Sequence, residues 1–503
     1  MGYVELFIEN WRLLVSTAII GAFVAKLVLA SANKQMRRTK LGFCPPQVSG
    51  WLPLSIDLAI SGMISLATHQ FFEWTRTLFD TYGSTVEVNA MGMKVLLTED
   101  PENIKAIQMT QFSDFPKGEL QHKIFAAVLQ DSVFATDGEA WINSKKQLST
   151  HLARVRPEEF DETESHYRKV LTQFKTGKVF DVYDIVDRYQ LDLVSCVYMG
   201  TSPNSIETGV QPIRWAMDTL LRTNVFRQWF GELGVLVSEK ILCPSAVKQL
   251  DLYLDSLASY TLDKPIGDIE KIPQQKRNLV EHLAVQRLGR KALKDQLIAV
   301  ILAAKDPTAI TIAWACFELA RKPDIYAELR KEIIDKIGNT APPDLAQLKS
   351  IKMLRAIVQE TMRLYHPLGM NLRSPPKDTT LPRGGGPNGD LPVAVLAGTQ
   401  VIYSVISHQR RESAAGRDPE SWKPHRWLDW QPDTWDYVPF NHGPRVCLGR
   451  NFGQMQVEYF LARTAQEFER IQPHDFDKYP GGEQRIKLEL NTKAAWPIKC
   501  SFH

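Results

Sequence analysis

FNHGPRVCLG, residues 440–449, is the stretch that decides the fold of this 503-residue chain. Glycine adopts backbone angles that other residues avoid, so Gly443 and Gly449 can turn amide N–H groups toward the Cys447 sulfur. An apolar segment from near Phe452 predicts a helix, whose N-terminal dipole lowers the pKa of a nearby thiol. The pattern predicts a cysteine thiolate held as a metal ligand. A buried structural cysteine in a Gly/Pro loop is the alternative.

The spacing F-x-x-G-x-R-x-C-x-G resembles the fingerprint of the cytochrome P450 superfamily at every fixed position. The resemblance implies haem b with Cys447 as the axial iron ligand, because an electron-rich thiolate favours O–O cleavage. It also implies that Gly443 shapes the ligand loop and that Phe440 packs on the haem. Arg445 offers a charged fork that suits a haem propionate.

Further positions match cation and aromatic sites of the same family. The segment Trp141-Ile-Asn-Ser-Lys145 matches W-x-x-x-R with lysine in place of arginine, which keeps the charge and loses the bidentate fork. Arg373 matches another propionate donor. We therefore expect Trp141, Lys145 and Arg373 to contact the cofactor, although each cation taken alone is more often a solvated surface residue.

An ion triad is expected to lock the cysteine loop. Glu360 and Arg363 stand three apart on a predicted helix, where they can pair. Arg426 matches the family position that completes this triad, and His425 stands where the family often has glutamate. Loss of one member of such a buried group strands the charges of the others.

The predicted oxygen-activating helix departs from the family pattern A-G-x-[D/E]-T. Here the segment is Ala303-Ala304-Lys305-Asp306-Pro307-Thr308, with proline in place of the first threonine. Proline removes an N–H and displaces the carbonyl four residues earlier, so we expect a kink that holds a water. Two interpretations stay open: proton relay through Asp306, water and Thr308, or chemistry that needs less proton delivery.

Composition places the chain among large globular proteins. Apolar residues make up 44% and aromatics 10%, and a net charge of +3 is too balanced to indicate nucleic-acid binding. The six cysteines show no CxxC pair or metal-ligand spacing, which suits a reducing compartment.

Residues 13–32 form a mostly apolar stretch of about the length that spans a bilayer. Lys26 interrupts it near one end, where its side chain can reach the interface. Basic residues follow at Lys34, Arg37, Arg38 and Lys40, which predicts a body that faces the cytosol. We expect a membrane anchor over 1–32, a basic and proline-containing linker over 33–50 and a catalytic domain over 51–503. A cleaved signal peptide and a core helix are the alternatives.

The fold class is expected to be mainly α with a small β subdomain, a cytochrome P450 fold preceded by an N-terminal transmembrane helix. Apolar spacing predicts helices over 292–321 and 348–365, and a buried central position for the first of them. Strand-like segments are 86–97, 392–405 and 485–502, and the turn-rich insert 381–390 predicts a hairpin.

Several stretches, 112–118 and 378–387 among them, resemble the fungal branch of the family that hydroxylates alkanes and fatty acids. The resemblance implies a single-pass endoplasmic-reticulum enzyme that inserts one oxygen from O2 into an apolar substrate. Its electrons would come from NADPH through a separate cytochrome reductase, because no flavin or dinucleotide-binding domain is evident. A tailoring oxidase of fungal secondary metabolism and a haem-thiolate isomerase or peroxygenase are the alternatives, and the change at Asp306-Pro307 allows both.

Overall fold

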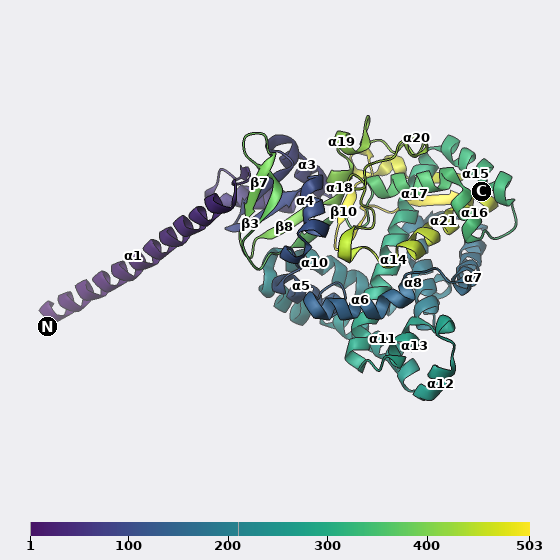
Figure 1. The fold of residues 1–503 in the computed structure, drawn as a ribbon, viewed down its shortest axis with the longest axis horizontal. Helices are drawn as coiled ribbons and strands as arrows, with labels where there is room; N and C mark the ends of the chain where they lie inside the picture. Colours follow the sequence, from purple (N-terminus) through teal and green to yellow (C-terminus); the bar gives the residue numbers. More distant parts are fainter. Residues whose placement is uncertain (1, 210) are drawn as a thin grey trace.

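Helices form most of the body, and strands gather beside them in small sheets, as the sequence predicts (Figure 1). The computed structural model describes residues 2–209 and 211–503, apart from the side chains of residue 127 and of several residues in the first helix. The principal helices are α1 (Gly2–Leu41), α2 (Ile56–Ala67), α6 (Gly138–Leu152), α7 (Pro157–Phe174), α8 (Val182–Met199), α10 (Pro212–Val237), α11 (Pro244–Leu262), α14 (Arg290–Arg321), α15 (Pro323–Ile337), α17 (Lys352–Leu364) and α21 (Arg450–Glu467).

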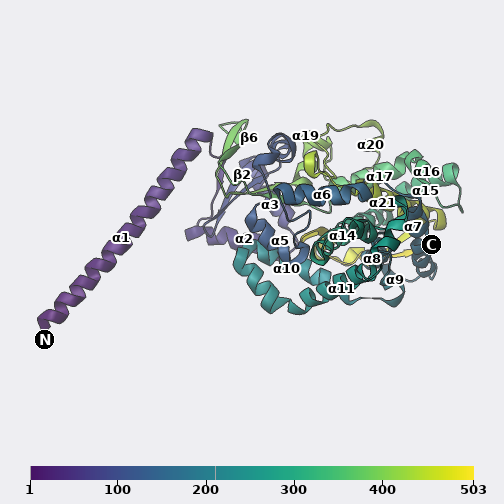
Figure 2. The same ribbon diagram turned by 60° about the horizontal axis from the view of Figure 1, so that its bottom comes forward.

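Helix α14 runs through the middle of the body and packs against α8, α11, α17 and α21 (Figure 2). It is apolar on all sides, with Leu297, Ile301 and Ile312 fully buried, and a helix that is hydrophobic all round is stable only inside a core. The prediction for 292–321 is therefore confirmed within one turn. Among the described residues, one helix is long and apolar enough to span a membrane. It is α14, and 83% of its most apolar segment is buried inside the body.

The largest sheet has five strands in the order β1-β2-β3-β8-β5. Their bounds are β1 (Gln47–Val48), β2 (Thr85–Ala90), β3 (Met93–Thr98), β8 (Gln400–Ser404) and β5 (Met370–Arg373). Strands β2 and β3 pair antiparallel, and β3 pairs parallel with β8. The sheet lies at the end of the body where α1 joins it (Figure 1).

Each strand-like segment divides into shorter strands. Residues 86–97 become the β2–β3 hairpin, because Met91 and Gly92 take positive φ values of 53° and 79° and reverse the chain. The predicted hairpin at 381–390 is confirmed as β6 (Thr379–Gly385) paired with β7 (Leu391–Val395). The C-terminal segment gives β10 (Ile486–Leu488), β11 (Thr492–Ala494) and β12 (Lys499–Phe502).

The N-terminal helix projects away from the body (Figure 1). Helix α1 continues to Leu41, through the first part of the predicted linker. Two of its basic residues pair with the body: Arg37 Nε donates to Asp378 at 2.7 Å, and Arg38 Nη1 donates to Glu87 at 3.2 Å. The base of α1 is thereby tied to the body. Much of the predicted anchor falls on residues whose side chains lie outside the described part of the chain.

Candidate active site

A cavity of about 550 Å³ lies between α14, α10 and the loop that carries Cys447, and its wall is mostly apolar. The predicted site residues that line it are Trp141, Lys145, Thr308, Arg373, Phe440, Arg445 and Cys447. Asp306 and Gly443 are not among the described lining residues. The structure therefore gathers most of the predicted site around one space.

The Cys447 thiol faces this cavity from a short loop. Its backbone N–H donates to the Phe440 carbonyl at 3.0 Å, which closes the loop on itself. Helix α21 begins three residues later at Arg450, close to the predicted start. Burial below the protein surface raises the pKa of the Cys447 thiol, while the Gly449 N–H and the Arg450 charge act in the opposite direction. The side chain is accessible because it borders the cavity.

Gly443 packs closely against the segment that holds Gln108. Its φ is +66°, and a Cβ there would lie 2.0 Å from the Gln108 carbonyl oxygen. The Gln108 side chain accepts from the His442 N–H at 2.7 Å and donates to the Asn441 side chain at 2.9 Å. Glycine at 443 thus lets the cysteine loop lie directly on the segment that holds Gln108.

The predicted ion triad is confirmed, with Glu360 and Arg363 buried and Arg426 partly buried. Arg363 donates to both Glu360 carboxylate oxygens at 2.8 and 3.0 Å, and Arg426 Nε donates to the same carboxylate at 3.0 Å. The Trp427 indole adds a fourth donor at 2.9 Å. Burial raises the pKa of Glu360, but Arg363 and the other donors outweigh it and the net pKa is lowered. His425 lies outside this cluster and pairs with Glu328 at the surface.

The Arg445 guanidinium has one carboxylate partner and several hydrogen-bond acceptors. Its Nη2 donates to the Asp137 carboxylate at 2.7 Å and to the Thr136 carbonyl at 2.8 Å. The guanidinium lies 4.6 Å from the Trp141 ring centre. Burial, with Arg373 nearby, lowers the pKa of Arg445 to about 10. A bound anion in the cavity would raise the pKa of Arg445 again, because it favours the charged guanidinium.

Lys145 and Arg373 reach the same end of the cavity from different elements. Lys145 Nζ donates to the Pro444 carbonyl at 2.7 Å, next to Arg445, and lies 5.4 Å from the Trp141 ring centre. Arg373 comes from β5 and is 4% exposed. Its Nε is buried without a hydrogen-bond partner among the described residues.

A fourth cation, Lys117, was missed by the sequence reasoning. It lines the cavity, and burial together with the charges of Arg373 and Arg445 holds its pKa well below the ordinary lysine range. Its ammonium lies 5.8 Å from the Phe125 ring centre. The available signal was one lysine between Pro116 and Gly118 in a segment singled out for its family resemblance.

These donors fit a large apolar ring that carries two carboxylates, as haem does. Four basic side chains, Lys117, Lys145, Arg373 and Arg445, line the cavity near Asp137, which pairs with Arg445. Glu489 also lines the cavity, and it pairs with Lys487 and Lys493. Asp137 also accepts from the Lys117 and Gly118 backbone N–H groups. The orphaned Arg373 Nε needs an acceptor, and a buried cation cluster is costly without anions.

Asp306 is buried beside a lysine and is not among the described residues that line the cavity. Lys305, fully buried, pairs with Asp306 and with Asp187 of α8. These two carboxylates raise the pKa of Lys305 against the effect of burial. Asn491 donates to Asp306 at 2.9 Å, and Asn491 lines the cavity. Asp306 therefore reaches the cavity wall only through this amide.

Pro307 is accommodated within an unbroken helix. Helix α14 runs through it as one element, from Arg290 to Arg321. Thr308 lines the cavity, and its hydroxyl donates to the Ala304 carbonyl at 2.9 Å. Thr311 likewise donates to the Pro307 carbonyl at 2.8 Å. The helix thus presents Pro307 and Thr308 to the cavity side by side.

Comparisons with known proteins agree with this geometry. The family model described as Cytochrome P450 matches residues 53–492. "Cytochrome P450 monooxygenase pvhE" of Talaromyces variabilis is 32% identical, over 95% of this chain and 93% of its own length. "Cytochrome P450 52A3-A" of Candida maltosa is 33% identical over 84% of each chain. "Cytochrome P450 52A6" of Candida tropicalis is 31% identical, over 92% of this chain and 93% of its own.

Proposed function

Because this chain belongs to the cytochrome P450 family and is a monooxygenase, we propose that it inserts one oxygen atom from O2 into a long apolar substrate at the membrane surface. The substrate class is a long-chain alkane, a fatty acid or a similar molecule, and the electrons come from NADPH through a separate cytochrome reductase. The observation that carries the proposal is the position of Cys447 on the wall of a mostly apolar cavity whose other wall is α14.

Haem b, when bound, supplies the iron at which O2 is reduced and the substrate C–H bond is oxidised. Cys447 would bind the iron, and Phe440 would pack beside the cofactor. Arg445, Arg373, Lys145 and Trp141 would hold the propionates, with Lys117 as a further basic residue of the cavity wall. These side chains fix the cofactor and match its negative charge.

The apolar side chains that α10 and α14 contribute to the cavity wall favour an apolar substrate. Leu221, Val225 and Trp229 of α10 line the cavity, and Ala299 and Ala303 of α14 do so too. Small residues on α14 leave room for a chain, and the surrounding surface excludes water from it. The sequence resemblance to the fungal alkane and fatty-acid hydroxylases points to the same class.

Proton supply is proposed to run through Thr308, with Asp306 as a positioning residue. The Thr308 hydroxyl lines the cavity, whereas Asp306 touches the wall through Asn491. The ion pair with Lys305 holds the Asp306 carboxylate in place beside Asn491, so we assign Asp306 the role of orienting that amide.

Replacing Pro307 with threonine is expected to raise the fraction of NADPH consumption that yields product by about two- to tenfold, or about 0.4–1.4 kcal/mol. The added hydroxyl supplies a second donor on the cavity side of α14. Pro307→Ala is the matched control, since it restores the N–H without a hydroxyl. Equal gains in both variants, or no gain in Pro307→Thr with an intact haem spectrum, would count against a hydroxyl deficit.

Membrane association is supported by two surfaces. Helix α1 projects from the body and carries the apolar stretch 13–32, with Lys34 and Lys40 left beside its paired arginines. Exposed apolar side chains also lie on α2, on the segment just before it and on α10. Helices α2 and α10 are neighbours, since a Cβ at Gly62 would lie 3.5 Å from Trp229 (Figure 2). The members of this patch are Trp51, Leu54, Ile60, Ile64, Phe230, Leu233 and Leu236.

A patch of this kind is typical of lipid or protein contact. Together with α1, it supports a single-pass anchor in the endoplasmic reticulum, with the catalytic domain facing the cytosol.

The test of the proposed function is product formation by vesicles that contain this protein. Long-chain fatty acids and alkanes are supplied with NADPH and a matched reductase in one set, and with hydrogen peroxide in another. Oxygenated product that requires both NADPH and reductase supports the proposal. Product formed only with peroxide, or a rearranged product formed without any donor, would favour the peroxygenase or isomerase alternative.

A further inference from the structure

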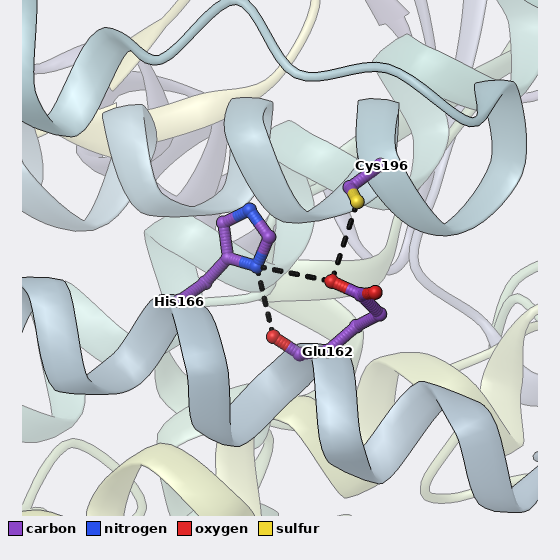
Figure 3. Close-up of side chains that lie close together, drawn as sticks. All are labelled: Glu162, His166 and Cys196. Carbon is purple, nitrogen blue, oxygen red and sulfur yellow. Dashed lines mark hydrogen bonds and ion pairs between the residues drawn. The ribbon is translucent and has the colours of Figure 1, made fainter.

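Three side chains with metal-binding atoms meet between α7 and α8, outside the cavity (Figure 3). Glu162 and His166 come from successive turns of α7, and Cys196 comes from the last turn of α8. Cys196 Sγ lies 3.3 Å from the Glu162 carboxylate oxygen Oε2, and His166 Nδ1 lies 3.7 Å from that same oxygen. All three ligand atoms lie within 4.8 Å of one another.

These separations match the edges of a tetrahedral zinc site. Zinc bonds of about 2.0 Å to nitrogen or oxygen and about 2.3 Å to sulfur place neighbouring ligand atoms about 3.3–3.8 Å apart. Two of the three separations already have these values. The third, between sulfur and nitrogen, needs only a small side-chain rotation.

The donor set selects a soft to borderline cation. Thiolate and imidazole bind zinc well, whereas calcium and magnesium need oxygen ligands. His166 is buried, but the Glu162 side chain is 44% exposed, so water has access to a fourth position. The nearby Asp192 is already committed, because it accepts from the Ser205 and Ile206 backbone N–H groups at 2.7 and 2.8 Å.

We propose that Glu162, His166 and Cys196 form a zinc site that pins α7 to α8, independent of the haem chemistry. In the metal-free state the Cys196 thiol donates to Glu162, and His166 Nδ1 is 2.8 Å from the Glu162 carbonyl. On binding, Cys196 releases its proton to solvent and forms the Zn–S bond, and His166 moves its proton to Nε2. No electron is transferred.

The charges around the site affect how strongly a proton competes with zinc for the Cys196 sulfur. Burial, then Glu162, raises the pKa of the Cys196 thiol to about 12, and Asp192 acts in the same direction. Lys169 opposes them, and it is itself paired with Glu207 at 3.3 Å. The thiol is therefore protonated at neutral pH without metal, and zinc takes the place of that proton.

Zinc content and zinc-edge X-ray absorption of the full-length haem-loaded protein test the proposal. After equilibration with zinc sulfate and dialysis, we expect about one zinc per haem, with one sulfur neighbour at about 2.3 Å and nitrogen or oxygen at about 2.0–2.1 Å. Iron does not interfere, since its absorption edge is separate.

Two variants and one control make the result specific. Cys196→Ser, which keeps the size and a donor to Glu162, is expected to lose the sulfur neighbour and most of the zinc, and His166→Asn most of the zinc. Cys44→Ser is the control, because Cys44 lies outside the cluster, where it accepts from Gln35 at 3.8 Å. An unchanged carbon monoxide spectrum of the reduced haem shows that each variant is folded. No retained zinc, zinc without sulfur, or equal zinc in Cys196→Ser and wild type would overturn the site.

Discussion

Replacing Cys447 with serine is expected to abolish the red-shifted absorption band of the reduced, carbon monoxide-bound haem. Serine keeps the size of the side chain and removes the thiolate that donates electron density to iron. Product formation should fall at least about a hundredfold, equivalent to about 2.7 kcal/mol of lost transition-state stabilisation. The loop itself should survive, because the bond from the 447 N–H to the Phe440 carbonyl uses only backbone atoms.

Absorption spectroscopy on the haem-reconstituted variant makes this measurement. Cys316→Ser and Cys44→Ser serve as controls, since neither thiol lines the cavity. Both should keep the band. A band that persists in Cys447→Ser would mean that another residue ligates the iron.

Replacing Glu360 with glutamine is expected to cost about 3–5 kcal/mol, because it leaves two arginines beside a buried neutral group. The Glu360 carboxylate accepts from Arg363, Arg426 and Trp427 with its two oxygens, whereas a glutamine amide has one acceptor oxygen and places an NH2 donor where the second oxygen was. For a domain of about 450 residues the unfolding entropy is about 0.9 kcal/mol per degree, so the midpoint of thermal unfolding should fall by about 3–5 °C. Loss of the haem absorption on heating reports it.

The matched control is His425→Gln, which removes an exposed pair with Glu328 next to the same cluster. Exposed pairs contribute about 0–1 kcal/mol, so its midpoint should change by less than about 1 °C. A Glu360→Gln midpoint equal to that of the control would show that the triad contributes little to stability.

The Glu360 effect should also depend on pH. The net pKa of Glu360 is lowered in the folded state, so its stabilising contribution is complete above the ordinary glutamate value of 4.5 and is lost as the pH falls below it. The difference in midpoint between wild type and Glu360→Gln should therefore shrink in acid. Protonation of other buried carboxylates in acid destabilises wild type and Glu360→Gln equally, so it cancels in the difference between their midpoints.

Local patterns with fixed spacing could be predicted from the sequence. The 440–449 loop, the start of α21 and the Glu360–Arg363 pair depend on residues close in the chain, so composition and spacing were enough. The extent of α14 follows from its unbroken apolar pattern. The hairpin of β6 and β7 follows from its turn-forming residues.

Distant pairings decided the rest. Lys305 forms ion pairs with its neighbour Asp306 and with Asp187, which is more than a hundred residues away, and no helical pattern shows the second contact. Lys117 joins the cavity only because the chain brings it beside Arg373.

The basic residues after the apolar N-terminal stretch carry the same lesson. Arg37 and Arg38 bind Asp378 and Glu87 of the body, so only part of the basic cluster remains for lipid headgroups. A charge count along the sequence treats all four cations alike. The four residues differ because Arg37 and Arg38 lie next to acidic residues of the body.

Oxygen-isotope labelling tests the central claim most directly. The protein, a reductase, NADPH and a long-chain fatty acid are incubated under ¹⁸O2 in ordinary water, and the product is analysed by mass spectrometry. We predict product with one ¹⁸O atom per molecule, formed only when NADPH and reductase are both present and absent in Cys447→Ser. Product without the label, or labelled product formed equally by Cys447→Ser, would contradict a thiolate-dependent monooxygenase.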